Sequence, residues 1–414
     1  MFRLEGLALA FGNPHFRLFT LSSIPSLLGT WIQRVAVGWL AWELTHSGAW
    51  LGAIAFADMF PAMVCTPIAG AFADRLDRLR VCRVMQYALA SQAAVLAALI
   101  IGGLITIELL VGLTFLQGIL QASHHPFRQS LVANMVEPEE LNAAIAVNSM
   151  SWHTARFVGP ALAGIAIVTV GAGTAIAINA VSYIPFLIAL HRLRPPHQPP
   201  RAAKRSVGEI PREIADGVRY VIGHRAIGPM LLVLVAMSVA GRAASEMLPG
   251  FADAIFDRGA MGLAWLTSAA GFGAVLGALW ASQGGDLARL PAQVIAAAMA
   301  LVLSLLGFVA TENFAIALPC LAVSALALTI GGVGTQTIVQ ASVPEGMRGR
   351  VLGLFGTLWL GLPALGALLV GAVSDQVGLQ AAVGGVAVLP ALAWLWALGR
   401  RKSIAGAVGA PAAP

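Results

Sequence analysis

The chain has 414 residues, of which 58% are hydrophobic and only 11% are charged, and its mean hydropathy is +0.82. An ordinary globular domain is about 45–50% apolar and about 25% charged, so the composition indicates an integral membrane protein. It excludes a large water-soluble catalytic domain, and the net charge of +6 reflects where basic residues sit in the loops rather than binding to nucleic acid.

Apolar segments of about twenty residues recur along nearly the whole chain, which is the length that a helix needs to cross about 30 Å of hydrocarbon. Each segment is predicted to form one membrane-spanning helix. In chain order the predicted spans cover residues 17–43, 50–73, 81–103, 107–133, 141–168, 172–192, 228–250, 261–282, 291–310, 313–340, 350–372 and 380–399.

The distribution of basic residues predicts the orientation of these spans. Most of the 25 Lys and Arg residues fall in the termini, in alternate loops or at the helix ends beside them, whereas Arg258 alone lies in the other loops. Because Lys and Arg stay preferentially on the cytoplasmic side, we expect both termini in the cytoplasm and a multi-pass protein of a bacterial-type inner membrane. The N-terminal segment lacks the pattern of a cleaved signal peptide.

A long polar loop divides the predicted spans into two sets of six. Its first part, LRPPHQPPRAAKRS, is proline-rich and is expected to be an extended linker. In its second part Ile210, Ile214, Val218 and Val221 recur at helical spacing, which predicts a short amphipathic helix at the cytoplasmic surface. The expected domains are residues 1–192, a linker at 193–226, residues 227–400 and a disordered tail at 401–414.

The two sets of spans resemble each other in sequence. Three landmarks of the first half recur in the second half at nearly the same separation along the chain. The matching pairs are Arg34 with Arg242, Gly70 with Gly277 and Pro138 with Pro344. Such an internal duplication is typical of transporter folds built from repeats rather than of a channel or a receptor.

The turn between the second and third spans, GAFADRLDRLR, is unusually rich in charge. Its residues Gly70, Asp74, Arg75, Arg78 and Arg80 are similar to the signature of the major facilitator superfamily. Asp77 departs from the pattern, since many members have glycine there. By this resemblance the fold is all-α, with twelve transmembrane helices as two pseudo-symmetric six-helix bundles, and Asp74 is part of a gating latch that opens and closes during transport.

Further segments resemble one branch of that superfamily, the enterobactin-exporter-like and drug-efflux-like members. These segments are residues 29–48, 125–144 and 343–354. In the fifth span, Arg156 precedes Gly159, Pro160 and Gly164, a pattern similar to the glycine-proline motif of antiporter members. The resemblance implies a secondary active exporter, usually driven by proton exchange, and implies no particular substrate.

Ionisable groups inside the bilayer are costly, by at least about 2.5–3.5 kcal/mol each on insertion scales, so each needs a partner or a function. Arg34 in the first span and Asp58 in the second lie at nearly equal depth on adjacent helices, which predicts a salt bridge. The pair is either a permanent tether or a proton-exchange site at Asp58. In the second case Arg34 has to move away, because a nearby arginine favours the ionised carboxylate.

Arg242 and Glu246 in the seventh span are one helical turn apart, so pairing within the helix is one explanation for them. The other is a role in transport, because by resemblance spans one, four, seven and ten line the central cavity. Arg156 beside Gly159 and Pro160 is read either as a packing and bending element or as a cavity residue.

Histidine and tryptophan residues supply further candidates. His153 in the fifth span and His124 in the fourth either titrate near neutrality or simply line a cavity, and no metal is expected at them. Trp31 and Trp359 are placed to stack on an aromatic or lipophilic substrate, whereas Trp42 near the outer boundary is expected to be an interfacial anchor.

No nucleotide-binding loop or catalytic constellation is found, so neither an enzyme nor an ATP-driven pump is expected, and no cofactor. The interpretation is an exporter of a small amphipathic or lipophilic molecule, of drug or siderophore type. Protons are the expected coupling ion, the lipid bilayer the expected surroundings and a monomer the expected state. The alternatives are an importer or uniporter of a metabolite or lipid, and a non-transporting membrane sensor on the same fold.

Overall fold

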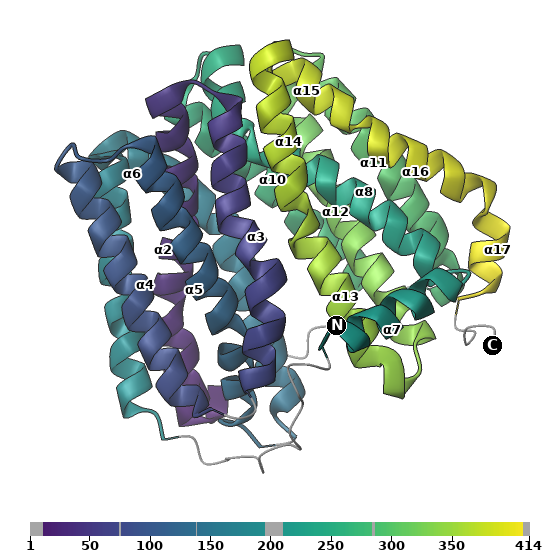
Figure 1. The fold of residues 1–414 in the computed structure, drawn as a ribbon, viewed down its shortest axis with the longest axis horizontal. Coiled ribbons are helices and arrows are strands. Elements are labelled where there is room, and N and C mark those ends of the chain that lie inside the picture. The colour runs from purple at the N-terminus through teal and green to yellow at the C-terminus, as the bar shows by residue number, and fades with distance from the viewer. Residues whose placement is uncertain (1–10, 74–75, 138, 195–209, 284–285, 409–414) are drawn as a thin grey trace. The chain divides into compact units, whose positions relative to one another are not determined.

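The computed structural model describes residues 11–73, 76–137, 139–194, 210–283 and 286–408 (Figure 1). Within these ranges the chain forms helices and turns and no strand. Asp74, Arg75 and Pro138, which the sequence analysis singled out, lie outside the described residues.

The described part of the first half of the chain contains five long helices, which account for the first six predicted spans. We call each crossing of the membrane a passage. The five helices are α2 (Pro14–Thr45), α3 (Gly48–Ala73), α4 (Arg78–Ile101), α5 (Ile107–Ala133) and α6 (Leu141–Arg192). Helix α6 has 52 residues and is interrupted at Gly171, whose φ of 81° and ψ of 158° are not helical. The fifth and sixth predicted spans therefore meet at one glycine, in a backbone conformation that other residues rarely adopt.

The second half begins with α7 (Ile210–Gly223) and then makes six passages. Three of these passages are interrupted. The seventh comprises α8 (Ile227–Glu246), α9 (Leu248–Gly250) and the π-helix η2 (Phe251–Ile255), the eleventh comprises α13 (Glu345–Leu360) and α14 (Leu362–Val377), and the twelfth comprises α15 (Leu379–Val386) and α16 (Val388–Gly399). The remaining elements are α10 (Gly259–Ser282), η3 (Leu287–Arg289), α11 (Leu290–Val309), α12 (Phe314–Ser342) and α17 (Arg401–Gly406).

Prolines account for two of the interruptions. Pro249 and Pro363 stand in the first turns of α9 and α14, directly after the preceding helices end. A proline has no backbone N–H and its ring clashes with the preceding turn, so a helix restarts there more readily than it continues.

Nine helices of the described part are long and apolar enough to cross a membrane. One of the nine, at residues 143–192, is 50 residues long and crosses twice. Helices α2 and α5, whose hydropathy is lowered by the polar residues that they carry, complete the twelve predicted passages.

Contacts group the chain into two units, which we describe separately. Unit 1 comprises residues 1–40 and 64–207, and unit 2 comprises residues 41–63 and 208–414. In unit 1, α4 packs against α5 and α6, and Phe16, Phe19, Phe127 and Phe186 are buried in one core cluster.

Unit 2 is organised around α12, which packs against α8, α10 and α11. The contact with α10 depends on glycines, because a Cβ at Gly273 would collide with the Ala322 backbone and a Cβ at Gly277 would lie 2.8 Å from the Leu326 carbonyl oxygen. Gly277, the counterpart of Gly70 in the second half of the chain, thus lies in a close helix contact.

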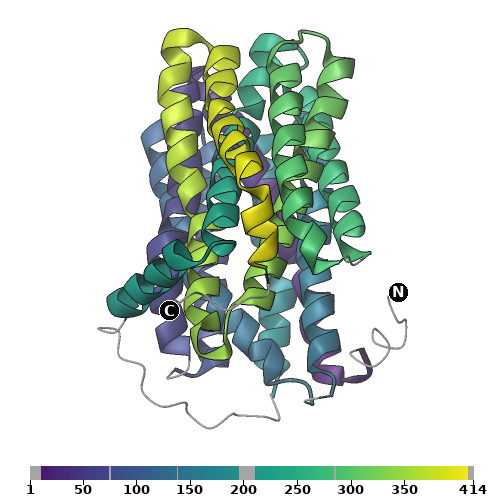
Figure 2. The same ribbon diagram turned by 90° about the vertical axis from the view of Figure 1, so that its right-hand side faces the viewer.

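The amphipathic helix predicted in the middle loop is α7, which runs obliquely across the ends of longer helices of unit 2 (Figures 1 and 2). It packs against α13, where Arg350 Nη1 lies 3.3 Å from Asp216 Oδ2. It also contacts the end of α12, because Tyr220 donates a hydrogen bond of 3.4 Å to the Ser342 carbonyl. Val221 joins a buried cluster with Val351. Val221, at the end of the predicted apolar stripe, therefore contacts protein.

Residues 401–406 differ from the disordered tail that was predicted to begin there. They form α17, which packs against α11, and Ile404 is fully buried. The burial of this one apolar side chain explains why the segment is helical.

Candidate transport site

The first candidate site in unit 1 is centred on Trp31 of α2. The guanidinium carbon of Arg34 lies 5.4 Å from the centre of the indole, and that of Arg156 lies 5.8 Å from it. Two predicted residues from different spans thus share one aromatic ring, at distances typical of cation–π contacts. The indole Nε1 is buried and donates no hydrogen bond within the described structure.

The glycine-proline motif brings α6 against α2 directly beside this cluster. A Cβ at Gly159 would collide with the Trp31 Cβ and would lie 3.5 Å from the Leu28 carbonyl oxygen. Gly164, five residues further along α6, is also buried. Gly159 therefore has a packing role: it lets the two helices approach closely enough for Arg156 to reach Trp31.

A network of buried amides lies beside Arg34 and was not predicted. Gln33 Nε2 donates to Gln117 Oε1 at 2.7 Å and to Gln92 Oε1 at 3.2 Å, while Asn179 Nδ2 donates to Gln33 Oε1 at 2.6 Å. Gln33 and Asn179 are fully buried. The network ties four passages of unit 1 together at the level of the cation cluster.

His124 lies in the interior of unit 1, one turn before a buried arginine that the sequence analysis did not select. Arg128 is 5% exposed, donates to Ser23 Oγ at 3.2 Å and lies 5.6–5.8 Å from the centres of the Phe19, Phe186 and Trp152 rings. His124 Nε2 is buried without a hydrogen-bond partner in the described part of the chain. His153 belongs to α6, and its side chain lies outside the description.

Unit 2 holds the matching arginine, Arg242 of α8. Its guanidinium carbon lies 5.2 Å from the centre of the Trp359 ring of α13, and Trp359 packs on Gly332 of α12, whose Cβ would lie 3.0 Å from the ring. Glu246 ends α8, so it stands at the break before α9 and the π-helix η2. Local π-helices are rare overall, and those that do occur are frequently found at functional sites.

The predicted charge pairs stay predictions. Arg34 belongs to unit 1 and Asp58 to unit 2. Arg34, Asp58, Arg156, Arg242 and Glu246 each interact with another group, so none of the five is an isolated charge.

A polar contact that the sequence analysis missed joins α3 to α14 within unit 2. Asp375, in the last turn of α14, accepts hydrogen bonds from Ser47 Oγ at 2.5 Å, from the Gly48 N–H at 2.7 Å and from the Ala49 N–H at 3.3 Å. The carboxylate therefore caps the N-terminus of α3. The helices approach closely, because a Cβ at Gly52 would lie 2.6 Å from the Ala367 carbonyl oxygen.

Trp42 takes part in a second such contact, and its prediction as an interfacial anchor is wrong. The indole is 5% exposed, packs on Gly250 and donates from Nε1 to Asp253 Oδ2 at 2.9 Å. Asp253 lies in the π-helix η2. The indole is buried in contacts with other residues of the protein, so it does not anchor the chain in the lipid headgroups.

The described part of the charged turn is held by a helix cap and by one hydrogen bond to α5. Asp77, the departure from the family pattern, is the N-cap of α4 and accepts a hydrogen bond from the Arg80 N–H at 3.1 Å. Arg78 Nη1 donates to Asn134 Oδ1 at 2.8 Å, which ties the turn to the end of α5. Gly70 belongs to α3, and the Arg80 side chain is exposed.

Comparison with known proteins gives consistent relatives. The profile of the family described as transmembrane secretion effector matches residues 7–403. The multidrug efflux pump Tap of Mycolicibacterium fortuitum is 26% identical over 377 residues, 88% of this chain and 90% of the pump. The enterobactin exporter EntS of Shigella boydii serotype 4 is 24% identical over 385 residues, 89% of this chain and 87% of the exporter.

A shorter match joins the chain to the staphyloferrin A transporter of Staphylococcus aureus, at 27% identity over 168 residues. This match spans 40% of the chain and 42% of that transporter, less than half of either.

Solved structures show the same fold. A bacterial homologue of the human lysosomal transporter Spinster matches with a TM-score of 0.74 at 14% identity, covering 95% of this chain and 98% of its own. A bacterial homologue of the iron transporter ferroportin matches with a TM-score of 0.69 at 14% identity, covering 93% and 98%. The predicted helical fold of two six-helix bundles is confirmed.

Proposed function

Because the chain belongs to the transmembrane secretion effector family of major facilitator transporters, we propose that it exports a small amphipathic or lipophilic compound by proton-coupled antiport. Members of this family are transporters rather than enzymes, so the chain is a multi-pass protein of the inner membrane that acts on a small molecule. Under the proposal two six-helix halves alternate between states open to either side of the membrane.

The similarity to a multidrug efflux pump and to an enterobactin exporter, each over nearly nine tenths of the chain, supports export. The observation that carries the substrate class is the pairing of arginine with indole in each unit, Arg34 and Arg156 on Trp31 and Arg242 on Trp359. An aromatic face beside a guanidinium offers apolar contact and hydrogen-bond donors together. Such a surface suits a molecule with an apolar body and a polar group.

Asp58 and Glu246 are the proposed proton-coupling residues. Each is a carboxylic acid in a predicted span with one of the two duplicated arginines nearby. Arg242 precedes Glu246 by four residues on the same helix, and Arg34 lies on the helix that precedes the helix of Asp58. Neutralising such an acid by protonation would release its attraction to an arginine, which gives proton entry a way to change helix contacts.

The test is a flux measurement in proteoliposomes with an imposed pH gradient and a panel of amphipathic dyes. We expect the gradient to drive dye movement, and Asp58→Asn or Glu246→Gln to reduce gradient-driven flux at least about tenfold while dye binding persists. Asp257→Asn changes an exposed acid outside the helices and is the matched control.

Each other result has a definite meaning. Full coupled flux in both variants would show that neither acid couples protons. Flux that is equal with and without the gradient would overturn antiport, movement in the uptake direction would favour an importer or uniporter, and binding without flux of any bound dye would favour a sensor.

The proposal includes the expected topology and gate. Both termini are placed in the cytoplasm, the chain acts as a monomer, and the halves are residues 1–192 and 227–400. The proposed gating turn consists of Gly70, Asp74, Arg75, Arg78 and Arg80. The hydrogen bond from Arg78 to Asn134 supports this proposal, because it connects the turn to the end of another helix, α5.

A further inference from the structure

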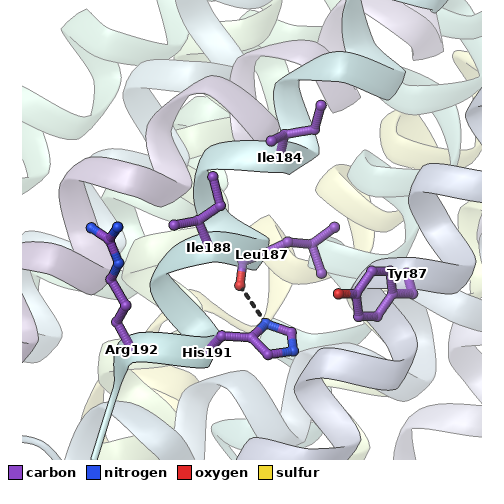
Figure 3. Close-up of a pocket in the computed structure, with 6 residues that line it drawn as sticks. All are labelled: Tyr87, Ile184, Leu187, Ile188, His191 and Arg192. Atoms are coloured by element: carbon purple, nitrogen blue, oxygen red, sulfur yellow. Dashed lines mark hydrogen bonds between the residues drawn. The ribbon is translucent and has the colours of Figure 1, made fainter.

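A surface groove in unit 1 lies between α4 and α6, away from Trp31 and the arginines around it. It has a volume of about 460 Å³ (Figure 3). Its lining consists of Tyr87, Ile184, Leu187, Ile188, His191 and Arg192. The groove therefore combines an apolar wall with basic residues at the end of α6.

The apolar wall is open to the surroundings of the protein. Tyr87 is 51% exposed, Ile184 48% and Ile188 49%. Apolar side chains that stay exposed in a membrane-spanning passage are suited to contact with lipid acyl chains rather than with water. Ile184 stands eight residues before Arg192, about 12 Å along the helix, so an acyl chain of a lipid whose headgroup lies at Arg192 is long enough to reach this wall.

The polar end of the groove is preorganised. His191 Nδ1 donates to the Leu187 carbonyl at 2.9 Å, which leaves Nε2 available, and the Tyr87 ring meets the imidazole edge-on at 5.9 Å between centres. Figure 3 shows Tyr87 reaching from α4 toward Leu187 and His191, with Arg192 on the side of Ile188.

The charge at this end is positive. Arg192 is exposed, and Arg194 follows it just beyond the end of α6. Arg83 Nε donates to the Leu190 carbonyl at 2.9 Å, so a third guanidinium lies at the same level. The six lining residues include no acid to neutralise these charges.

We propose that this groove binds an anionic phospholipid of the leaflet at the Arg192 end of α6, the cytoplasmic leaflet in the proposed topology. The phosphate pairs with Arg192, the tyrosine hydroxyl and imidazole meet the glycerol region, and one acyl chain lies along Ile184 and Ile188. Anionic headgroups favour such basic pockets between transmembrane helices, and the acyl chain distinguishes the lipid from free phosphate.

The experiment uses the full chain in detergent, titrated with phosphatidylglycerol or with phosphatidylcholine of the same acyl chains. Native mass spectrometry counts bound lipid, and the thermal midpoint reports stabilisation. We expect phosphatidylglycerol to bind more tightly, and Arg192→Gln to weaken its binding about fivefold, the effect of one basic residue at a membrane surface. Arg401→Gln removes an exposed cation from α17 and is the matched control.

A second variant, Ile188→Trp, places a larger side chain in the groove without changing its charge. It should reduce binding of phosphatidylglycerol while leaving the thermal midpoint of the lipid-free protein unchanged. Equal affinity for the two lipids would overturn the proposal. So would equal losses in Arg192→Gln and Arg401→Gln, or displacement of the lipid by glycerophosphoglycerol, which has the headgroup and no acyl chains. These readouts do not involve transport, so they stand independently of the exporter assignment.

Discussion

At the scale of single residues, the polar side chains of unit 1 divide into those near Trp31 and those that hold the bundle together. Arg34 and Gln33 are neighbours in the sequence but differ in role: the guanidinium stands over an indole, whereas the amide is fully buried among three other amides. Buried amides without partners would each cost about 1–3 kcal/mol. The complete network therefore stabilises one arrangement of four passages and keeps Arg34 in place.

The residue-scale prediction is that Gln33→Ala destabilises the protein. The change removes the two hydrogen bonds that Gln33 donates and the one that it accepts, so the free energy of unfolding should fall by about 1–3 kcal/mol. A thermal melt of the purified protein in detergent measures the effect as a lower midpoint. Gln376→Ala removes an exposed amide from α14 and should leave the midpoint unchanged; equal midpoints for Gln33→Ala and the native chain would contradict the role of the network.

Sequence reasoning found the arginines of the site but not this network, for a physical reason. A charge inside an apolar segment is conspicuous because its burial is so costly. Glutamine and asparagine are tolerated at many positions, and Gln33, Gln117 and Asn179 are far apart in the chain, so only the fold shows that they meet.

At the scale of helices, Asp375 connects two elements by their ends. An acid in the last turn of α14 is unfavourable for that helix, whose C-terminus carries partial negative charge, but it is favourable at the N-terminus of α3. The hydrogen bonds to Asp375 stabilise only arrangements in which the two helices are in contact. Asp375 therefore acts as a clasp between α3 and α14.

We expect Asp375→Ala to loosen this clasp. Hydrogen bonds to a charged group contribute about 1.5–3 kcal/mol, so states with the helices apart should become at least about tenfold more populated. The measurement is the rate of thiol labelling at Ala49→Cys, in a chain whose Cys65, Cys82 and Cys320 are replaced by serine. Glu312→Ala, which removes an exposed acid of the same unit, is the control, and an unchanged labelling rate in Asp375→Ala would show that the contact does not restrain the helices.

The predictability of elements follows the same logic. Residues 107–133 were predicted as a span and form α5 with those bounds, because the polar N-cap Thr106 and C-cap Asn134 mark the two ends of the helix in the sequence. The π-helix at Phe251–Ile255 was missed, since it depends on hydrogen-bond register rather than on composition. Helix α7 was predicted from its stripe, but its contact with α13 was not, because the stripe does not identify the surface that covers it.

At the scale of the whole molecule, the internal duplication seen in the sequence has a chemical counterpart. Arg34 and Arg242 occupy matching places, and each lies over an indole of its own unit. The indoles do not match: Trp31 is on the same helix as its arginine, whereas Trp359 comes from a different passage. The two halves thus share a feature built from different elements.

The topology is a prediction that can be tested on the complete chain. Alkaline phosphatase fused after residue 414 should be inactive, because the positive loops place that end in the cytoplasm. The same enzyme inserted between α11 and α12, at residues 310–313, should be active. Activity at the C-terminus with none at the loop would reverse the proposed orientation.

Gly171 has a practical consequence for engineering. The passages on either side of it are joined with no spare residues, and its positive φ suits no other L-amino acid well. One inserted residue would turn the second passage by about 100° about its own axis, so Asn179 would face away from Gln33. Epitope tags and spectroscopic probes therefore belong in a longer connection, such as residues 310–313 between α11 and α12, and not at this turn.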